Sequence, residues 1–228
     1  MLLVINNSNR NKEVLNYLRK SKRLLGFSNK CNKESKKNNQ TRTIYVTDKL
    51  IEYLKKKKVV YKNIISKKEL KTFLSKGSKE RIDGIILGGS NLKYSNKLCA
   101  CSVNNNIISL LEFKVPILGI CFGFQTIAMS HGGEVLSMSN MVNAKKKVIL
   151  KKSKLFKNLK NEENFKFMHN DYVSEIPQSF KIIGKTTNKM IQAIEHKEKP
   201  IYGVQFHPEV SGKVGEKLLD NFLDICNL

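Results

Sequence analysis

Residues 115–131 read VPILGICFGFQTIAMSH, a short apolar run followed by a segment in which apolar residues recur with helical spacing from Phe122 onward. This pattern predicts a buried strand that turns directly into a helix. The turn falls at Cys121, and Gly119 and Gly123 flank it two positions away on either side. A residue on such a sharp corner needs small neighbours, because the backbone folds back on itself.

The position of Cys121 suits a nucleophile. A helix N-terminus favours the thiolate, which is the attacking form of a cysteine. A single cysteine is more often a small buried hydrophobic residue, but the two flanking glycines favour a reactive thiol here. We therefore predict that Cys121 is the nucleophile of an enzyme.

A second motif, His207-Pro208-Glu209, begins 86 residues after Cys121 and follows an apolar strand candidate at residues 201–206. Proline biases the residue before it away from helical geometry, so His207 is expected at the end of that strand. Open α/β sheets place their sites at the carboxyl ends of strands. His207 is thus the predicted base, and Glu209 can turn back to orient its imidazole.

The two segments PILGICFGFQ (residues 116–125) and GVQFHPEV (residues 203–210) resemble the two signatures of the class I, or triad, glutamine amidotransferases. The resemblance implies that Cys121 attacks the side-chain amide of L-glutamine. It also implies that His207 is the general base and acid and that Glu209 orients it. The fold implied is α/β and flavodoxin-like, with a mostly parallel central sheet flanked by helices.

Amide hydrolysis also needs hydrogen-bond donors for the tetrahedral oxyanion. Residues 85–90 (IILGGS) form an apolar strand candidate that ends in two glycines. The resemblance implies that the N–H groups of Gly89 and Phe122 form the oxyanion hole, and that Gly88 and Gln125 help to bind substrate glutamine.

The C-terminal third is most similar to the glutaminase of GMP synthetase, whereas anthranilate and aminodeoxychorismate synthase glutaminases typically have serine at the place of Val210. Met168-His169-Asn170-Asp171 stands where that family usually reads Ser-His-Gly-Asp. His169 and Asn170 are therefore expected to position glutamine rather than to act as a second base. Ser90 departs from the family's usual proline and leaves that turn less rigid.

The first half of the chain alternates between strand and helix patterns, which predicts a parallel sheet covered on both faces. Strands are expected at residues 2–5, 43–46, 59–65 and 83–87, and helices at 12–25, 48–56, 67–74 and 104–113.

In the second half we expect additional short antiparallel strands at residues 133–137, 147–151, 165–169, 180–186 and 190–195, followed by a terminal helix at 212–226. No repeat or linker divides the chain, so residues 1–228 are predicted to be a single glutamine amidotransferase domain. Residues 26–41 are rich in Asn, Lys and Ser and are predicted to be a flexible polar insertion.

The chain lacks the Ser-Gly-Gly-x-Asp-Ser pyrophosphate loop that the ATP-using half of GMP synthetase would carry. The resemblance therefore implies that the ammonia is consumed by a separate ATP-dependent synthetase subunit, of the GMP synthetase ATP-pyrophosphatase type. No cofactor and no metal are expected. Cys99-Ala100-Cys101 has no second ligand pair at a spacing that a zinc site needs.

The formal net charge of +23 raises the alternative of nucleic-acid binding. Arginine, the better reader of bases and phosphates, occurs only five times, whereas lysine is spread along the whole chain. We expect no specific nucleic-acid partner, although weak binding to polyanions follows from charge alone.

Five cysteines, no secretory signal and no apolar run of about 20 residues predict a cytoplasmic protein without a membrane partner. Three further functions are compatible with the same motifs. They are a glutaminase of anthranilate or aminodeoxychorismate synthase, a γ-glutamyl peptide hydrolase, and a catalytically silent homologue.

Overall fold

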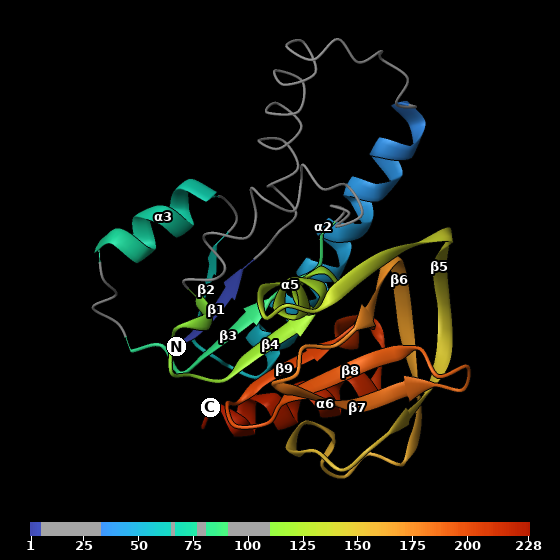
Figure 1. Ribbon diagram of the computed structural model, residues 1–228. Helices are drawn as coiled ribbons and strands as arrows, with labels where there is room; N and C mark the ends of the chain where they lie inside the picture. Colours follow the sequence, from blue (N-terminus) through green and yellow to red (C-terminus); the bar gives the residue numbers. More distant parts are fainter. Residues whose placement is uncertain (6–32, 65–66, 77–80, 91–109) are drawn as a thin grey trace.

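The computed structural model describes residues 1–5, 33–64, 67–76, 81–90 and 110–228, which form one nine-stranded sheet with flanking helices (Figure 1). The strand order is β2-β1-β3-β4-β9-β8-β7-β5-β6. The parallel strands are β1 (Leu2–Ile5), β2 (Tyr61–Ile64), β3 (Gly84–Leu87), β4 (Ile117–Ile120) and β9 (Ile201–Val204). The antiparallel strands are β5 (Glu134–Leu150), β6 (Glu162–Glu175), β7 (Phe180–Thr186) and β8 (Ile191–His196). The predicted α/β class, with antiparallel strands added in the C-terminal half, is confirmed.

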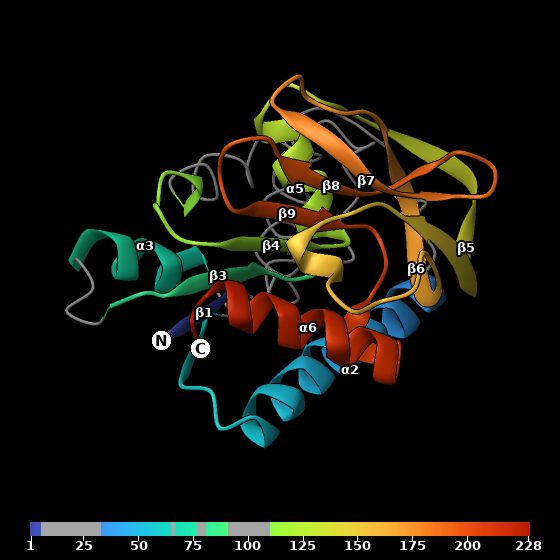
Figure 2. The same cartoon turned by 90° about the horizontal axis from the view of Figure 1, so that it is seen from below.

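Helices cover both faces of the parallel part of the sheet. They are α2 (Lys33–Lys56), α3 (Lys67–Lys76), α5 (Phe122–Ser130) and α6 (Lys213–Ile225), with 3-10 turns η1 (Lys154–Phe156) and η2 (Pro208–Val210). Figure 2 shows α2 and α6 side by side on one face, with α5 on the other. Among the described residues, no helix combines the length and the apolar character that crossing a bilayer requires.

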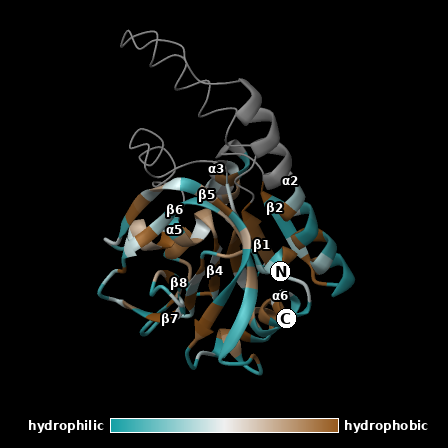
Figure 3. Cartoon of the chain, turned by 90° about the vertical axis from the view of Figure 1, so that its right-hand side faces the viewer, coloured by the Kyte–Doolittle hydropathy of each residue, from teal (hydrophilic) through white to brown (hydrophobic). Residues whose placement is uncertain are grey.

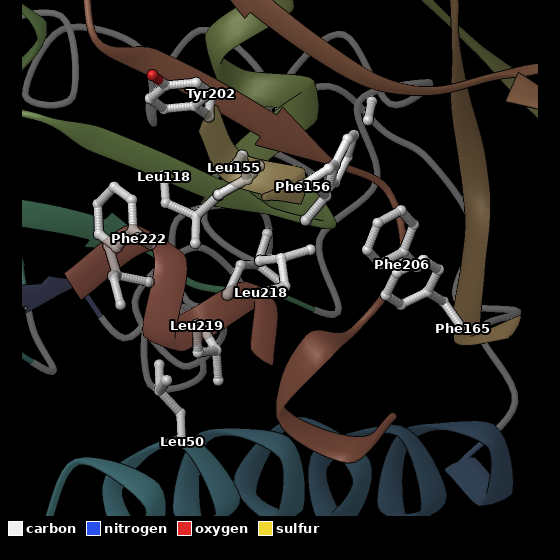
Figure 4. Close-up of a cluster of buried hydrophobic side chains, with 14 of the residues drawn as sticks. Leu50, Leu118, Leu155, Phe156, Phe165, Tyr202, Phe206, Leu218, Leu219 and Phe222 are labelled. Carbon is white, nitrogen blue, oxygen red and sulfur yellow. The ribbon is translucent and has the colours of Figure 1, made fainter. Parts of the chain in front are cut away.

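The hydrophobic core is split in two by the alternation of side chains along the strands. Leu2 and Val4 of β1 belong to the cluster that packs against α2 and α6, whereas Leu3 and Ile5 belong to the cluster on the α5 side. Figure 4 shows the first cluster, and Figure 3 shows hydrophobic residues on the inner strands and hydrophilic ones along the outer ribbon of β5. The sheet is therefore buried on both faces where the strands are parallel.

The predicted strand and helix around Cys121 are confirmed as β4 and α5, and two glycines allow them to meet. A Cβ atom on Gly123 would lie 2.0 Å from the carbonyl oxygen of Leu87, at the end of β3. A Cβ atom on Gly119 would lie 2.6 Å from the backbone of Gly123. Side chains at either position would separate α5 from the sheet, so the glycines are needed for this close approach.

The strand predicted at 43–46 is wrong, because these residues belong to α2. The same helix includes residues 33–41 of the expected polar insertion. The stretch from 33 to 46 contains no glycine or proline, and its lysine, glutamate and glutamine residues have good helix propensity. Because the segment is so polar, it lacks the apolar periodicity from which a helix is usually predicted.

The strands expected at 133–137 and 147–151 are the two ends of the single strand β5, whose pairing with β6 shifts register between Ser137 and Val142. The helix expected at 12–25, residues 26–32 of the insertion, Cys99 and Cys101, and most of the helix expected at 104–113 lie outside the described residues. The strand expected at 165–169 is the middle of the longer strand β6, and the helix expected at 48–56 is the C-terminal part of α2. The other predicted elements within the described residues agree with the structure within a few residues.

We expect Gly123→Ala to lower the free energy of unfolding by about 3 kcal/mol, because the added methyl group meets the Leu87 carbonyl. Gly132→Ala, just beyond the other end of α5, is the control. It has open space around it and φ of 89°, so only about 1 kcal/mol of backbone strain is expected. Urea denaturation measures the free energy of unfolding of both variants. Equal losses of stability would contradict the close approach of α5 to β3.

Candidate active site

Cys121 lies at the corner between β4 and α5 in a conformation that non-glycine residues rarely adopt. Its φ is 54° and its ψ is −104°. The backbone holds this corner: the Cys121 N–H donates to the Val204 carbonyl at 2.8 Å, and the Cys121 carbonyl accepts from the Gln125 N–H at 3.1 Å. Such strain persists where the surroundings enforce it, and it is concentrated at functional sites.

His207 and Glu209 form a buried pair at the carboxyl end of β9. His207 Nδ1 lies 2.8 Å from Glu209 Oε1, and the two side chains are 5% and 3% exposed. Pro208 begins η2, and this short turn brings Glu209 back to the imidazole. Glu209 therefore turns back toward the His207 imidazole, as predicted.

The electrostatic environment of His207 favours the imidazolium. Burial alone lowers the pKa of His207, but the charge of Glu209, the charge of Cys121 and hydrogen bonds to both side chains outweigh burial and raise that pKa above its ordinary value. Because Nδ1 faces Glu209, Nε2 is the ring nitrogen directed to Cys121. The arrangement can hold a thiolate beside an imidazolium.

The antiparallel half of the sheet curls back, so that its strand β6 lies next to His207. The His207 N–H donates to the Lys166 carbonyl of β6 at 2.8 Å, which forms an isolated antiparallel bridge. Ser211 reinforces it: its hydroxyl donates to the His207 carbonyl at 2.6 Å and accepts from the Lys166 N–H at 2.9 Å. Phe165 and Phe206, the chain neighbours of the two bridged residues, stack with ring centroids 3.9 Å apart (Figure 4).

The two glycines after β3 occupy different environments. A Cβ atom on Gly89 would lie 3.1 Å from His207 Cε1 and 3.9 Å from Cys121 Cβ, so Gly89 is brought directly against both residues. Gly88 instead continues the sheet, since its N–H donates to the Ile5 carbonyl at 3.0 Å. Phe122, the other residue expected at the oxyanion hole, is the first residue of α5 and is buried.

His169 lies in β6 and is buried. Its Nδ1 is 2.9 Å from the Asp171 carbonyl, which can only accept, so Nδ1 carries the proton. Burial, aided by the charge of His207, lowers the pKa of His169 to about 4, although the hydrogen bond to the Asp171 carbonyl acts in the opposite direction. His169 is therefore neutral near pH 7, as a positioning residue would be. Asn170 is partly buried, beside the place where the pairing of β5 and β6 is irregular.

A chain of side-chain amides connects β6 to the sulfur of Cys121. Gln125 Nε2 donates to the Asp171 carbonyl at 2.7 Å and to Gln205 Oε1 at 3.1 Å. Gln205 Nε2 lies 3.7 Å from Cys121 Sγ, and the Met168 carbonyl lies 3.8 Å from the same atom.

Gln205 is a site residue that was not predicted from the sequence. A signal was present, because Gln205 stands two positions before His207, and residues two apart in an extended segment point to the same side.

The fold and these distances define a class of protein. A strained cysteine at a strand-to-helix corner, next to a buried histidine and carboxylate, is the arrangement of cysteine-dependent acyl-transfer enzymes. The family model described as glutamine amidotransferase class-I matches residues 39–226. The chain belongs to the class I glutamine amidotransferase family.

Relatives within this family include GMP synthases. The chain is 40% identical over 151 residues to a GMP synthase [glutamine-hydrolyzing] subunit of Methanocaldococcus jannaschii, an alignment that covers 65% of this chain and 77% of that protein. It is 41% identical over 148 residues to GMP synthase [glutamine-hydrolyzing] of Francisella philomiragia, covering 63% of this chain. The match spans only 28% of that longer relative.

Solved structures agree with the fold. A crystal structure of a proposed GMP synthase subunit from Thermoplasma acidophilum superimposes with a TM-score of 0.67 at 28% identity, covering 79% of this chain and 88% of that one. A glutamine amidotransferase from Thermotoga maritima, at 17% identity and a TM-score of 0.56, supports the fold alone; the match covers 77% of this chain and 76% of that one.

The lowered pKa of His169 has a consequence for stability. Between about pH 4, its folded value, and 6.5, its ordinary value, the unfolded chain binds more protons than the folded one. Stability is therefore lost as the pH falls through this window, by at most about 3 kcal/mol from this group.

We expect His169→Gln to make the free energy of unfolding fall less between pH 7 and pH 4.5, measured by urea denaturation. An unchanged fall would contradict the burial of a neutral imidazole.

Proposed function

We propose that Cys121, His207 and Glu209 form a catalytic triad that hydrolyses L-glutamine to glutamate and ammonia. The observation that carries the proposal is the buried His207–Glu209 pair, 2.8 Å apart, with its imidazole directed to a strained cysteine. Membership of the glutamine amidotransferase family supplies the substrate class.

The reaction proceeds in two halves. The Cys121 thiolate attacks the γ-carboxamide carbon, and the imidazolium of His207 gives its proton to the departing amide nitrogen, which leaves as ammonia. The remaining γ-glutamyl thioester is attacked by water. His207 accepts the proton of that water as glutamate forms, and the sulfur leaves as the thiolate. Glu209 stabilises the imidazolium whenever His207 carries the proton, and it keeps the ring oriented throughout.

The oxyanion of each tetrahedral intermediate is proposed to accept hydrogen bonds from the N–H groups of Gly89 and Phe122. Gly89 lies against both His207 and Cys121, and Phe122 opens α5, where backbone N–H groups point toward the corner.

For substrate binding we propose Gln125, with Gly88, His169 and Asn170 shaping the same site. Both hydrogens of the Gln125 amide are engaged by Asp171 and Gln205, which leaves its Oε1 as the group that would accept from the substrate's ammonium.

The proposed partner is a separate ATP-dependent synthetase subunit of the GMP synthetase ATP-pyrophosphatase type, which would consume the ammonia. Relatives that are themselves named as subunits support this, because the alignment covers 77% of one of them but only 28% of a longer GMP synthase. A glutaminase of anthranilate or aminodeoxychorismate synthase is the alternative, and Val210 in place of serine argues against it. A nucleophilic thiol has to stay reduced, which favours the cytoplasm as its compartment.

We expect Cys121→Ala to lower glutaminase turnover by at least about 1,000-fold, because no other group replaces the nucleophile. Cys226→Ala is the matched control: Cys226 is also a buried free cysteine, but it lies beside Gly84 at the other end of the strands. Ammonia and glutamate release should persist in the control. Turnover that survives in Cys121→Ala would overturn the proposal.

A second expectation concerns pH. Glu209 is a main cause of the raised pKa of His207, so Glu209→Gln should let the imidazolium lose its proton at lower pH. The alkaline limb of the kcat/KM profile should move to lower pH, and kcat should fall by about 10- to 100-fold. Glu216→Gln, which removes an exposed carboxylate on α6, is the control. An alkaline limb that stays in place would contradict the role given to Glu209.

A further inference from the structure

Gln205 lies just beyond the end of β9 and is completely buried, with 0% of its surface exposed. Its backbone N–H donates to the Gln192 carbonyl at 2.8 Å, which continues the sheet. Its side chain is held separately, between the Gln125 amide at 3.1 Å and the sulfur of Cys121 at 3.7 Å. Main chain and side chain therefore have different partners.

The hydrogen-bond network determines which end of the Gln205 amide faces the sulfur. The Asp171 carbonyl can only accept, so the Gln125 atom beside it at 2.7 Å must be the NH2 group. That same NH2 group is 3.1 Å from Gln205, whose facing atom must then be the oxygen. The remaining end of Gln205, its NH2 group, points to Cys121 Sγ. Turning this amide over would set two NH2 groups against each other.

The sulfur of Cys121 consequently has one neighbour that donates and one that accepts. The Met168 carbonyl, 3.8 Å away, suits a neutral thiol that donates a hydrogen bond, and it opposes a negative charge on the sulfur. The Gln205 NH2 group instead favours the thiolate, because a hydrogen bond is stronger when its acceptor is ionised. Since the site is buried and its effective dielectric constant is low, a single such bond has a large effect on the thiolate.

We propose that Gln205 is a further catalytic residue, which donates an N–H···S hydrogen bond to the Cys121 thiolate and so increases the thiolate fraction available for attack. The Asp171 carbonyl and Gln125 act through Gln205, as positioning groups that set the direction of its amide. The inference rests on the proposed function, in which the sulfur of Cys121 is the nucleophile.

The test measures the thiolate without using glutamine. Cys121 is alkylated with iodoacetamide at a series of pH values, and modification is quantified by mass spectrometry of the peptide that contains Cys121. The proteins are wild type, Gln205→Met, Gln205→Glu and the control Gln192→Met. Gln192 is an equally buried glutamine on the adjacent strand β8, and its side-chain Oε1 has no hydrogen-bond partner in the part of the chain that the structure describes.

We expect the pH midpoint of Cys121 alkylation to rise by about one unit in Gln205→Met, with a roughly tenfold loss of kcat/KM at pH 7. Gln205→Glu preserves the shape and one contact with Gln125, but its ionised carboxylate repels the thiolate, so its midpoint should rise at least as far. Gln192→Met should keep the wild-type midpoint.

Unchanged midpoints in both Gln205 variants, with circular dichroism and thermal unfolding like the wild type, would overturn the inference. If Gln205→Met does not fold, Gln205→Glu decides alone, because it is nearly isosteric. Wild-type protein that alkylates normally but does not hydrolyse glutamine would instead refute the proposed function, so the two failures are distinguishable.

Discussion

The site depends on one constraint, the close approach of three backbone segments at the start of α5. Gly119, Gly123 and Leu87 are packed so tightly that a single Cβ atom on either glycine would overlap neighbouring backbone. This packing leaves the chain only a sharp corner between β4 and α5, and Cys121 occupies it with a φ of 54°. The core on both faces of the sheet, with α2 and α6 on one side and α5 on the other, holds that corner in place.

The second half of the chain completes the site through the sheet itself. After β9 the order β8-β7-β5-β6 curls until Lys166 of β6 pairs with His207. The curl gives the cysteine neighbours that no parallel strand could supply: the Met168 carbonyl beside the sulfur, and the Asp171 carbonyl that orients the amide chain. Parallel strands thus position the sulfur, and the antiparallel extension determines much of its electrostatic environment.

Local patterns in the sequence were sufficient to predict the elements that depend on residues close together in the chain. The glycines around Cys121 and the proline after His207 predicted the corner and the strand end, and both are present. The N-terminal part of α2 was not predicted, because a polar helix lacks the apolar periodicity that reveals one. Gln205 was missed for a different reason: its spacing from His207 places it on the same side of the segment, but its partners Cys121 and Gln125 lie 84 and 80 positions away, and the spacing does not identify them.

The attack of the Cys121 sulfur on glutamine is tested most directly by labelling with a glutamine analogue that carries an electrophilic diazoketone in place of the side-chain amide, followed by peptide mass spectrometry. We expect one label per chain, located on Cys121, with protection by free L-glutamine. Loss of glutaminase activity with the label on another residue, or with Cys121 unmodified, would contradict it.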